Sequence, residues 1–292
     1  MGRSPRADPG VNGLVVVDKP AGWTSHDVVA RCRRLLGTRK VGHSGTLDPG
    51  ATGILLVGAG HVTRLLRFLG DLPKDYAGEV VLGARTTTLD DEGEVVDRFD
   101  MDGVTLAAAR GASAALVGDI LQVPPMVSAV QVGGRRLHDL ARQGIEVHRE
   151  ARPVTVHSLE LEPTDDPLVL RMRVSCSTGT YVRVLAADLG TLLGGGAHLR
   201  RPRRTAIGPF GEEAATPLEK VGPEVLAPPL AAVAHLARVA VGEEAAADIR
   251  HGKVLPTWEG EGPWAVTGPD GTLLAVYETY RPGLAKPAVV LA

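Results

Sequence analysis

Cysteine, aromatic residues and long apolar runs are all scarce in this chain of 292 residues. Its two cysteines, Cys32 and Cys176, are too few for a disulfide framework or a cysteine zinc site, and each falls on an apolar face. We therefore expect two buried free thiols. A transmembrane helix needs about eighteen consecutive apolar residues, and no stretch of this chain is that long. Residues 1–10 lack the apolar core of a secretory signal. A cytoplasmic protein without a membrane segment fits these absences.

Familiar cofactor and metal motifs are missing as well. There is no GxxxxGKS or GxxxxGKT phosphate loop, and no GxGxxG sequence follows a predicted strand. The nine histidines show no HExxH or similar ligand spacing. The sequence therefore indicates neither a nucleotide cofactor nor a metal.

The distribution of charge says more than the net charge of −2. Residues 1–220 carry 27 Lys+Arg against 26 Asp+Glu, whereas residues 221–292 carry 5 against 8. The first part holds three local basic groups: Arg31, Arg33, Arg34, Arg39 and Lys40; Arg135 and Arg136; and Arg200, Arg201, Arg203 and Arg204. Such groups can bind phosphates on a protein that is neutral overall. Taken alone, they are better explained as solvated surface.

Hydrophobic periodicity predicts strands and helices without a strict βαβ rhythm. The predicted strands are residues 14–17, 54–57, 76–82, 154–161 and 170–176, and the last alternates most cleanly. The predicted helices are 24–36, 62–69, 104–117 and 137–142, and one that is capped at Thr180 and runs to 193. Because short turns join several strands, we expect an α+β fold with a mostly antiparallel central sheet flanked by helices.

A proline-rich stretch at residues 216–231 suggests a domain boundary. We expect a disordered arm over residues 1–11, a main domain over 12–225 and a small β-rich domain over 226–292. Within that small domain, residues 264–267 and 273–276 read as strands.

The loop at residues 42–53 is rich in glycine, proline and small polar residues, and it holds Asp48 between Leu47 and Pro49. A glycine-rich loop can present one acid to a ligand at a fixed angle. Aspartate before proline is also a common turn starter, and composition alone favours that reading.

Eight sequence motifs, taken in order, add what composition cannot. They are GLVVVDKPAGWTS at 13–25, GHSGTLDP at 42–49 with ATG at 51–53, KDY at 74–76, a loop with Gly83, Thr86, Thr88, Asp90 and Gly93, QVPP at 122–125, ARQG at 141–144, GTYVR at 179–183 and AHLRR at 197–201. Together they resemble the TruB family of bacterial tRNA pseudouridine synthases over residues 12–211.

The resemblance implies a reaction and a catalytic group. Members of this family cut the C1′–N1 bond of a uridine, turn the base and rejoin it through C5, with no redox cofactor or metal. Asp48 takes the place of the essential aspartate, which either attacks C1′ or removes a ribose proton. Arg183 resembles its arginine partner. Tyr76 resembles the tyrosine that stacks on the flipped uracil, and Tyr181 looks like a second tyrosine near the aspartate.

The same resemblance assigns residues to RNA binding. His43, after Gly42, resembles a histidine that fills the space left by the flipped base. Gly42, Lys19, Leu199 and Arg200 are assigned to substrate binding with it. Lys19 would order the turn near the site, and Leu199 would line the uracil pocket. The basic residues expected to contact RNA phosphates are Arg31, Arg33, Arg34, Arg39, Lys40 and Arg201.

Three positions depart from the usual family pattern. Val127 and His138 stand where the family often has an aromatic residue, and Gln131 stands where it often has a lysine. They concern a substrate-side loop and leave the chemistry intact. The family also carries a C-terminal β-barrel of the PUA type, which residues 226–292 match less clearly.

The resemblance implies a monomeric enzyme that modifies uridine 55 in the T-arm stem-loop of tRNA without an obligate protein partner. Three alternatives stay open. The first is a guide-RNA-dependent pseudouridine synthase, the second a tRNA-folding chaperone whose catalysis is incidental, and the third a purely structural RNA-binding module.

Overall fold

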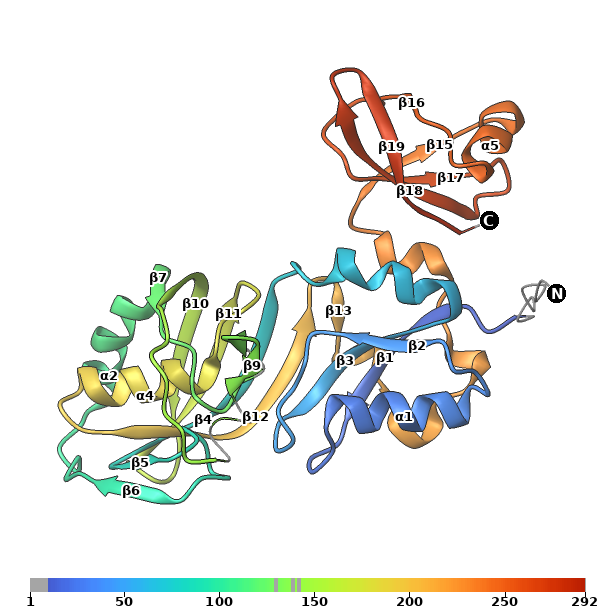
Figure 1. Ribbon diagram of the computed structural model, residues 1–292. Coiled ribbons are helices and arrows are strands. Elements are labelled where there is room, and N and C mark those ends of the chain that lie inside the picture. Colours follow the sequence, from blue (N-terminus) through green and yellow to red (C-terminus); the bar gives the residue numbers. More distant parts are fainter. Residues whose placement is uncertain (1–9, 129–130, 138–139, 141–142, 292) are drawn as a thin grey trace.

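The computed structural model describes residues 10–128, 131–137, 140 and 143–291. Within them the chain forms a ten-stranded sheet, a five-stranded sheet near the C-terminus and two small hairpins (Figure 1). The arm predicted over residues 1–11 lies outside the described residues except for its last two. The helix predicted over 137–142, with His138 and the first half of the ARQG motif, lies mostly outside them too.

The ten-stranded sheet is mostly antiparallel. Its main path runs β14-β1-β3-β12-β4-β11-β10-β7, with β2 beside β3 and β13 beside β12. Of its strand pairs, β1–β14 and β3–β12 are parallel. The strands are β1 (Gly13–Lys19), β2 (Val41–Ser44), β3 (Thr52–Ala59), β4 (Lys74–Leu82), β7 (Gly118–Gln122), β10 (Arg152–Pro163), β11 (Val169–Cys176), β12 (Ala197–Ile207), β13 (Phe210–Gly211) and β14 (Thr216–Pro217). The predicted α+β class is confirmed.

Helices cover the two ends of this sheet. Helix α1 (Ser25–Leu35) packs against β1 and β3, whereas α2 (Leu106–Ser113) and α4 (Val182–Leu192) pack at the other end (Figure 1). The Thr24 hydroxyl accepts from the Asp27 N–H, and the Asp27 carboxylate accepts from the Thr24 N–H. This is the predicted capping box. The prediction of a Thr180 cap is wrong, because Tyr181 is the N-cap residue of α4 and no side chain caps it.

The helix predicted over residues 62–69 is instead two 3-10 turns, η1 (Gly60–Arg64) and η2 (Leu66–Leu69). Over so short a stretch, apolar spacing does not separate a 3-10 from an α-helix. The other 3-10 turns are η3 (Ala114–Leu116), η4 (Glu212–Ala214), η5 (Leu218–Lys220), η6 (Pro223–Val225) and η7 (Pro229–Val233). The two hairpins are β5 (Ala84–Thr86) with β6 (Val95–Arg98), and β8 (Gln131–Val132) with β9 (Arg135–Arg136).

Strand β12 was not predicted, yet it joins the two halves of the sheet. It pairs with β3 through Arg203 and Arg204 only, and with β4 along most of its length (Figure 1). Its pairing with β4 is interrupted by two register shifts, and it contains Pro202 and four arginines. These features hide the period of two by which a strand is usually recognised.

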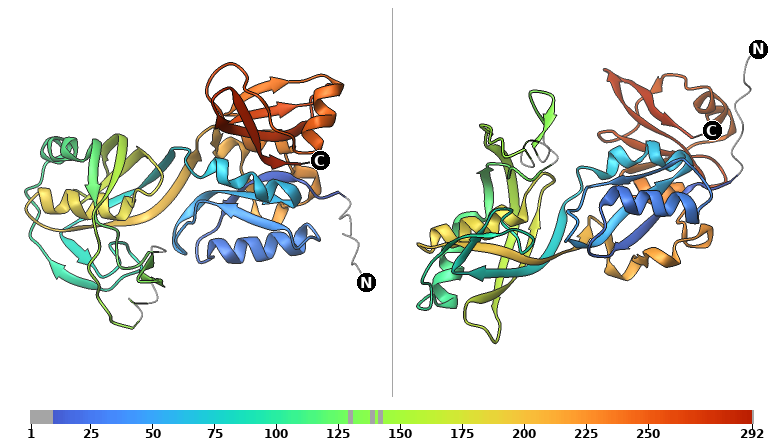
Figure 2. Two further views of the ribbon diagram at one scale, coloured as in Figure 1. Left: turned by 45° about the horizontal axis from the view of Figure 1, so that its top comes forward. Right: turned by 60° about the horizontal axis from the view of Figure 1, so that its bottom comes forward.

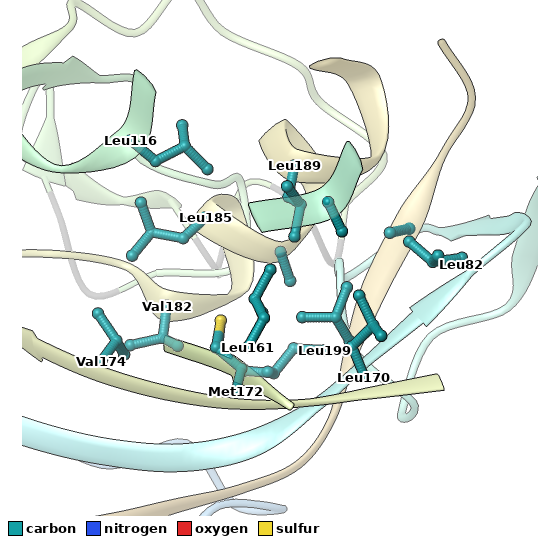
Figure 3. Packing of buried hydrophobic residues seen from close by; sticks show 14 of the residues in the cluster. Leu82, Leu116, Leu161, Leu170, Met172, Val174, Val182, Leu185, Leu189 and Leu199 are labelled. Carbon is teal, nitrogen blue, oxygen red and sulfur yellow. The ribbon is translucent and has the colours of Figure 1, made fainter. Parts of the chain in front are cut away.

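The main apolar core lies between α4 and the sheet. Leu185 and Leu189 of α4 pack over Leu170, Met172 and Leu199 (Figure 3). Both cysteines are buried free thiols, as predicted. No helix in the described residues is long and apolar enough to span a membrane.

The C-terminal sheet follows the order β15-β17-β18-β19-β16 and is accompanied by α5 (Glu243–Arg250). Its strands are β15 (Ala237–Ala240), β16 (Leu255–Pro256), β17 (Trp264–Thr267), β18 (Leu273–Arg281) and β19 (Leu284–Val290). It lies beside η1 and η2, away from α2 and α4 (Figure 2). Arg67 pairs with Glu278 at 2.8 Å, and one apolar cluster contains residues of both sheets. The strands predicted at 264–267 and 273–276 are confirmed.

Gly53 allows β3 to approach β12. Its φ is 98°, in the left-handed region that favours glycine, and an added Cβ would lie 2.2 Å from the carbonyl oxygen of Arg204. Any larger side chain would therefore push the two halves of the sheet apart.

Replacing Gly53 by alanine should lower the free energy of unfolding by about 2 kcal/mol or more, because it adds both backbone strain and a clash with backbone. Gly111 on the exposed side of α2 has no atom within 4 Å of an added Cβ. There, alanine should raise stability by about 0.4–1 kcal/mol. Urea denaturation of the two variants measures both effects, and similar small changes would contradict the assigned strain.

Candidate active site

A cavity of about 220 Å³ opens where the two halves of the ten-stranded sheet meet. Its walls are the loop between β2 and β3, strands β4 and β12, and the turn that leads into α4. Five residues singled out from the sequence line this cavity together: Asp48, Tyr76, Tyr181, Arg183 and Leu199.

The loop that carries Asp48 is held on both sides of this residue. The Leu47 N–H donates to Ser25 Oγ at 2.9 Å. The Lys19 ammonium, which is fully buried, donates to the carbonyl of Pro49 at 3.0 Å and also to those of Pro20 and Trp23. Burial lowers the pKa of Lys19 to about 8. Lys19 does not line the cavity, but it ties the first turn of the chain to the aspartate loop.

Arg183 aims Asp48 from the first turn of α4. Its Nη2 lies 2.9 Å from Oδ2 of Asp48, and 5% of its side chain is exposed against 44% for Asp48. The guanidinium also donates to the carbonyls of Thr88 and Val127 at 2.8 and 3.0 Å. A cation in the first turn of a helix is disfavoured by the helix dipole. Its place here is explained by these partners.

Asp90 is a site residue that the sequence analysis did not select. It is buried, and its Oδ2 lies 3.3 Å from Nη1 of Arg183. Its Oδ1 accepts hydrogen bonds from the Thr88 hydroxyl and the Glu92 N–H. The motif around Asp90 was recognised, and the structure shows that it positions Arg183 between two carboxylates.

Two opposing influences act on the Asp48 carboxyl. Its partial removal from water on the cavity wall raises its pKa above the ordinary value, and the neighbouring Arg183 guanidinium opposes that rise. A less acidic carboxyl is a better base and nucleophile, while the ion pair maintains its direction.

The basic group at residues 200–204 was expected to be solvated surface, and for Arg204 this prediction is wrong. Only 1% of this residue is exposed, and it lines the cavity rather than the outer surface. Its guanidinium carbon lies 6.0 Å from the centre of the Tyr76 ring. Burial raises the pKa of the Tyr76 hydroxyl above its ordinary value, which favours the protonated phenol.

Gln122 is a second residue that was missed as part of the site. Its side chain is buried, accepts from the Tyr181 N–H at 2.7 Å and donates to the Tyr181 carbonyl at 3.1 Å. It thereby fixes the backbone of the tyrosine that precedes α4. Leu199 is 1% exposed and forms part of the cavity's apolar wall.

His43 lies on β2, outside the cavity lining. Its ring meets His26 edge-on with centroids 5.5 Å apart, and its Nδ1 is buried without a hydrogen-bond partner in the described residues. Burial, assisted by the charges of His26 and Arg204, lowers the pKa of His43 to about 4. At Gly42, an added Cβ would lie 3.3 Å from Leu66. The strand before the aspartate loop thus presents a neutral imidazole.

The other predicted RNA contacts are spread over the surface. Arg33, Arg34, Arg39 and Lys40 are exposed in α1 and the turn that follows it, and Arg31 is half-buried. Arg200 does not line the cavity, because its Nε pairs with Glu79 at 2.8 Å. Arg201 has a side chain that is 76% exposed. Over the described ranges, no group of three or more His, Cys, Asp or Glu residues could hold a metal ion.

The lowered pKa of His43 makes a prediction about stability and pH. Between about pH 6.5 and pH 4 the unfolded chain takes up a proton at His43 that the folded chain does not, so stability should fall as the pH falls through this window. His43→Gln should reduce that slope, and the same change at the exposed His157 should not. Denaturation at several pH values measures it; an unchanged slope in His43→Gln would contradict the burial effect.

Two family models match the chain. Residues 33–182 match the N-terminal domain of TruB family pseudouridylate synthases, and residues 236–292 match the C-terminal domain of tRNA pseudouridine synthase II.

Relatives and solved structures agree with these matches. The tRNA pseudouridine synthase B of Thermobifida fusca is 47% identical over 96% of this chain and 99% of its own. That of Halalkalibacterium halodurans is 42% identical over 97% of this chain and 98% of its own. A chain in the crystal structure of a Cbf5-Nop10-Gar1 complex aligns with a TM-score of 0.72 at 27% identity, covering 91% of this chain and 78% of that one. The chain therefore belongs to the TruB family of pseudouridylate synthases.

Proposed function

We propose that this protein is a tRNA pseudouridine synthase that isomerises uridine 55 of tRNA to pseudouridine. The observation that carries the proposal is the pairing of Asp48 with Arg183 at 2.9 Å on the wall of a cavity that Tyr76 also lines. A fixed, ionised carboxylate beside a reacting sugar can attack C1′ or accept a ribose proton.

The reaction is balanced within the substrate. The C1′–N1 bond breaks, the uracil turns, and a C1′–C5 bond forms. The hydrogen on C5 then leaves as a proton, and N1 gains a proton. Asp48 acts at the sugar, and Arg183, locked by Asp90, keeps the carboxylate aimed at it.

Tyr76 and Leu199 suit a detached uracil. Both line the cavity of about 220 Å³, which has room for one flipped base but not for a duplex. A base leaves its stack to reach such a site and is then held by stacking on an aromatic ring. Tyr181, fixed through Gln122, closes the same wall.

His43 and the exposed basic residues suit the RNA around that base. The His43 imidazole is neutral and its buried Nδ1 has no hydrogen-bond partner in the described part of the chain, which favours stacking in the space that the flipped base leaves. Arg31, Arg34, Arg39, Lys40 and Arg201 are our proposed contacts with the phosphates of the T-arm stem-loop.

The wider assignments are proposals of the same kind. We propose a cytoplasmic monomer that needs no protein partner, with residues 12–225 as the catalytic domain and 226–292 as a PUA-like domain. Ala227 pairs with Leu14 of β1, so the linking segment lies on the catalytic sheet.

The decisive test is tritium release from C5-tritiated uridine in an unmodified T-arm hairpin. The wild-type protein should release tritium without added metal or cofactor. Asp48→Asn should reduce release by about 10⁴-fold or more while still binding the hairpin, because it removes the reacting charge without changing shape. Asp165→Asn, on an exposed loop, should behave as the wild type.

Other outcomes would favour the alternatives. A folded wild type that binds the hairpin but releases no tritium would overturn the stand-alone enzyme and favour a guide-dependent synthase or a structural RNA-binding module. Full biological effect of Asp48→Asn in cells would favour a chaperone.

The proposed phosphate contacts make a separate prediction. Replacing Arg39 and Lys40 together by glutamine should weaken hairpin binding and reduce the slope of log affinity against log salt by about 1–2. The turnover number should change little, because both residues are exposed and outside the cavity lining. The matched control replaces Arg171 and Arg173 on β11, and equal losses from the two pairs would contradict a defined RNA path.

A further inference from the structure

Arg204 is a buried cation without a role in the reaction steps proposed above. It lies on β12 directly opposite Tyr76 on β4 in the strand register. Its guanidinium carbon is 6.0 Å from the centre of the Tyr76 ring, and 1% of the residue is exposed. The charge of Arg204 is therefore largely unscreened by water where it meets Tyr76.

Three backbone carbonyl groups accept hydrogen bonds from Arg204. Its Nε donates to Ile54 at 2.7 Å, its Nη2 to Gly45 at 2.9 Å and its Nη1 to Thr46 at 3.5 Å. In the described ranges, no carboxylate lies within ion-pair distance of it, whereas Arg183 meets two. The site therefore retains a buried positive charge that the protein itself does not neutralise.

The same guanidinium joins two parts of the site. Gly45 and Thr46 are the first residues of the loop that carries Asp48, and Tyr76 on β4 lines the same cavity. Because a guanidinium is planar and rigid, its bonds to the loop and its contact with the ring fix one relative geometry.

We propose that Arg204 is a positioning residue, which holds the aspartate loop by its hydrogen bonds and acts on the uracil through the ring of Tyr76. This inference rests on the proposed function. When the C1′–N1 bond breaks, the bonding electron pair stays with the uracil, which becomes anionic until the C1′–C5 bond forms. A cation beside Tyr76 lowers the cost of that charge and strengthens the phenol as a donor.

Two substitutions separate the bonds of Arg204 from its charge. Arg204→Gln keeps a planar donor but removes the charge, and we expect a loss in kcat of about 100-fold with KM for the hairpin within about threefold. Arg204→Lys keeps the charge but not the fork, and we expect a loss of about tenfold. Arg203→Gln, on the same strand but only partly buried and paired with Asp18 and Glu212, should stay within about twofold.

A second readout follows the charge without using activity. The chain has four tyrosines, so 3-fluorotyrosine labelling gives few ¹⁹F signals, and Tyr76→Phe assigns the relevant one. The neighbouring Arg204 lowers the pKa of Tyr76 against the effect of burial. The Tyr76 signal should therefore titrate at higher pH in Arg204→Gln than in wild type, and near the wild-type pH in Arg204→Lys. Asp48 and Cys176, which also influence Tyr76, are unchanged in both.

Each outcome supports or overturns the inference. A folded Arg204→Gln with kcat within threefold of wild type overturns it. Equal losses in both variants, with no movement of the Tyr76 titration, overturn it in favour of a merely structural role. If Arg204→Gln does not fold, Arg204→Lys decides, because wild-type kcat there overturns the role of the fork. An inactive wild type would instead refute the proposed function, and the ¹⁹F titration would still test the charge.

Discussion

A guanidinium removed from water is costly unless its donors find partners, and this protein buries two beside one cavity. Arg183 satisfies its donors with two carboxylates and two carbonyls, and Arg204 with three carbonyls. These partners come from β3, the loop before it, the loop after β5 and residue 127. The need to satisfy two cations therefore fixes where segments far apart in the sequence meet, and Asp48 lies at that meeting point.

Local sequence patterns predicted those elements whose residues follow a single periodicity or capping pattern. The alternation of residues 170–176 and the capping box at Thr24 each depend on neighbours in the chain, and both appear in the structure. Strand β12 does not follow one rule. It contains a proline, two register shifts and arginines on both faces. Arg204 lines the cavity, whereas Arg200 pairs with Glu79 and Arg203 with Asp18.

The site divides in the same way. Family motifs pointed to Asp48, Tyr76, Tyr181, Arg183 and Leu199, and the structure places all five on one cavity. Motifs alone could not separate the roles of adjacent arginines. Arg203 is partly exposed and ion-paired, whereas Arg204 is buried, although nothing in their sequence context distinguishes them. That difference arises from the sheet pairing, which brings Arg204 opposite Tyr76. Asp90 and Gln122 were overlooked for a similar reason, since their partners are remote in the chain.

The apolar cluster shared by the two sheets has a further consequence. Leu14, Ile54 and Val62 pack in one cluster with Ala265 and Val276 of the C-terminal sheet. Each sheet buries part of its apolar surface against the other. The two sheets therefore stabilise each other and should unfold as one cooperative unit rather than independently. Recombination that exchanged the C-terminal segment between relatives would then be constrained by the fit of this buried seam, even if that segment never touched RNA.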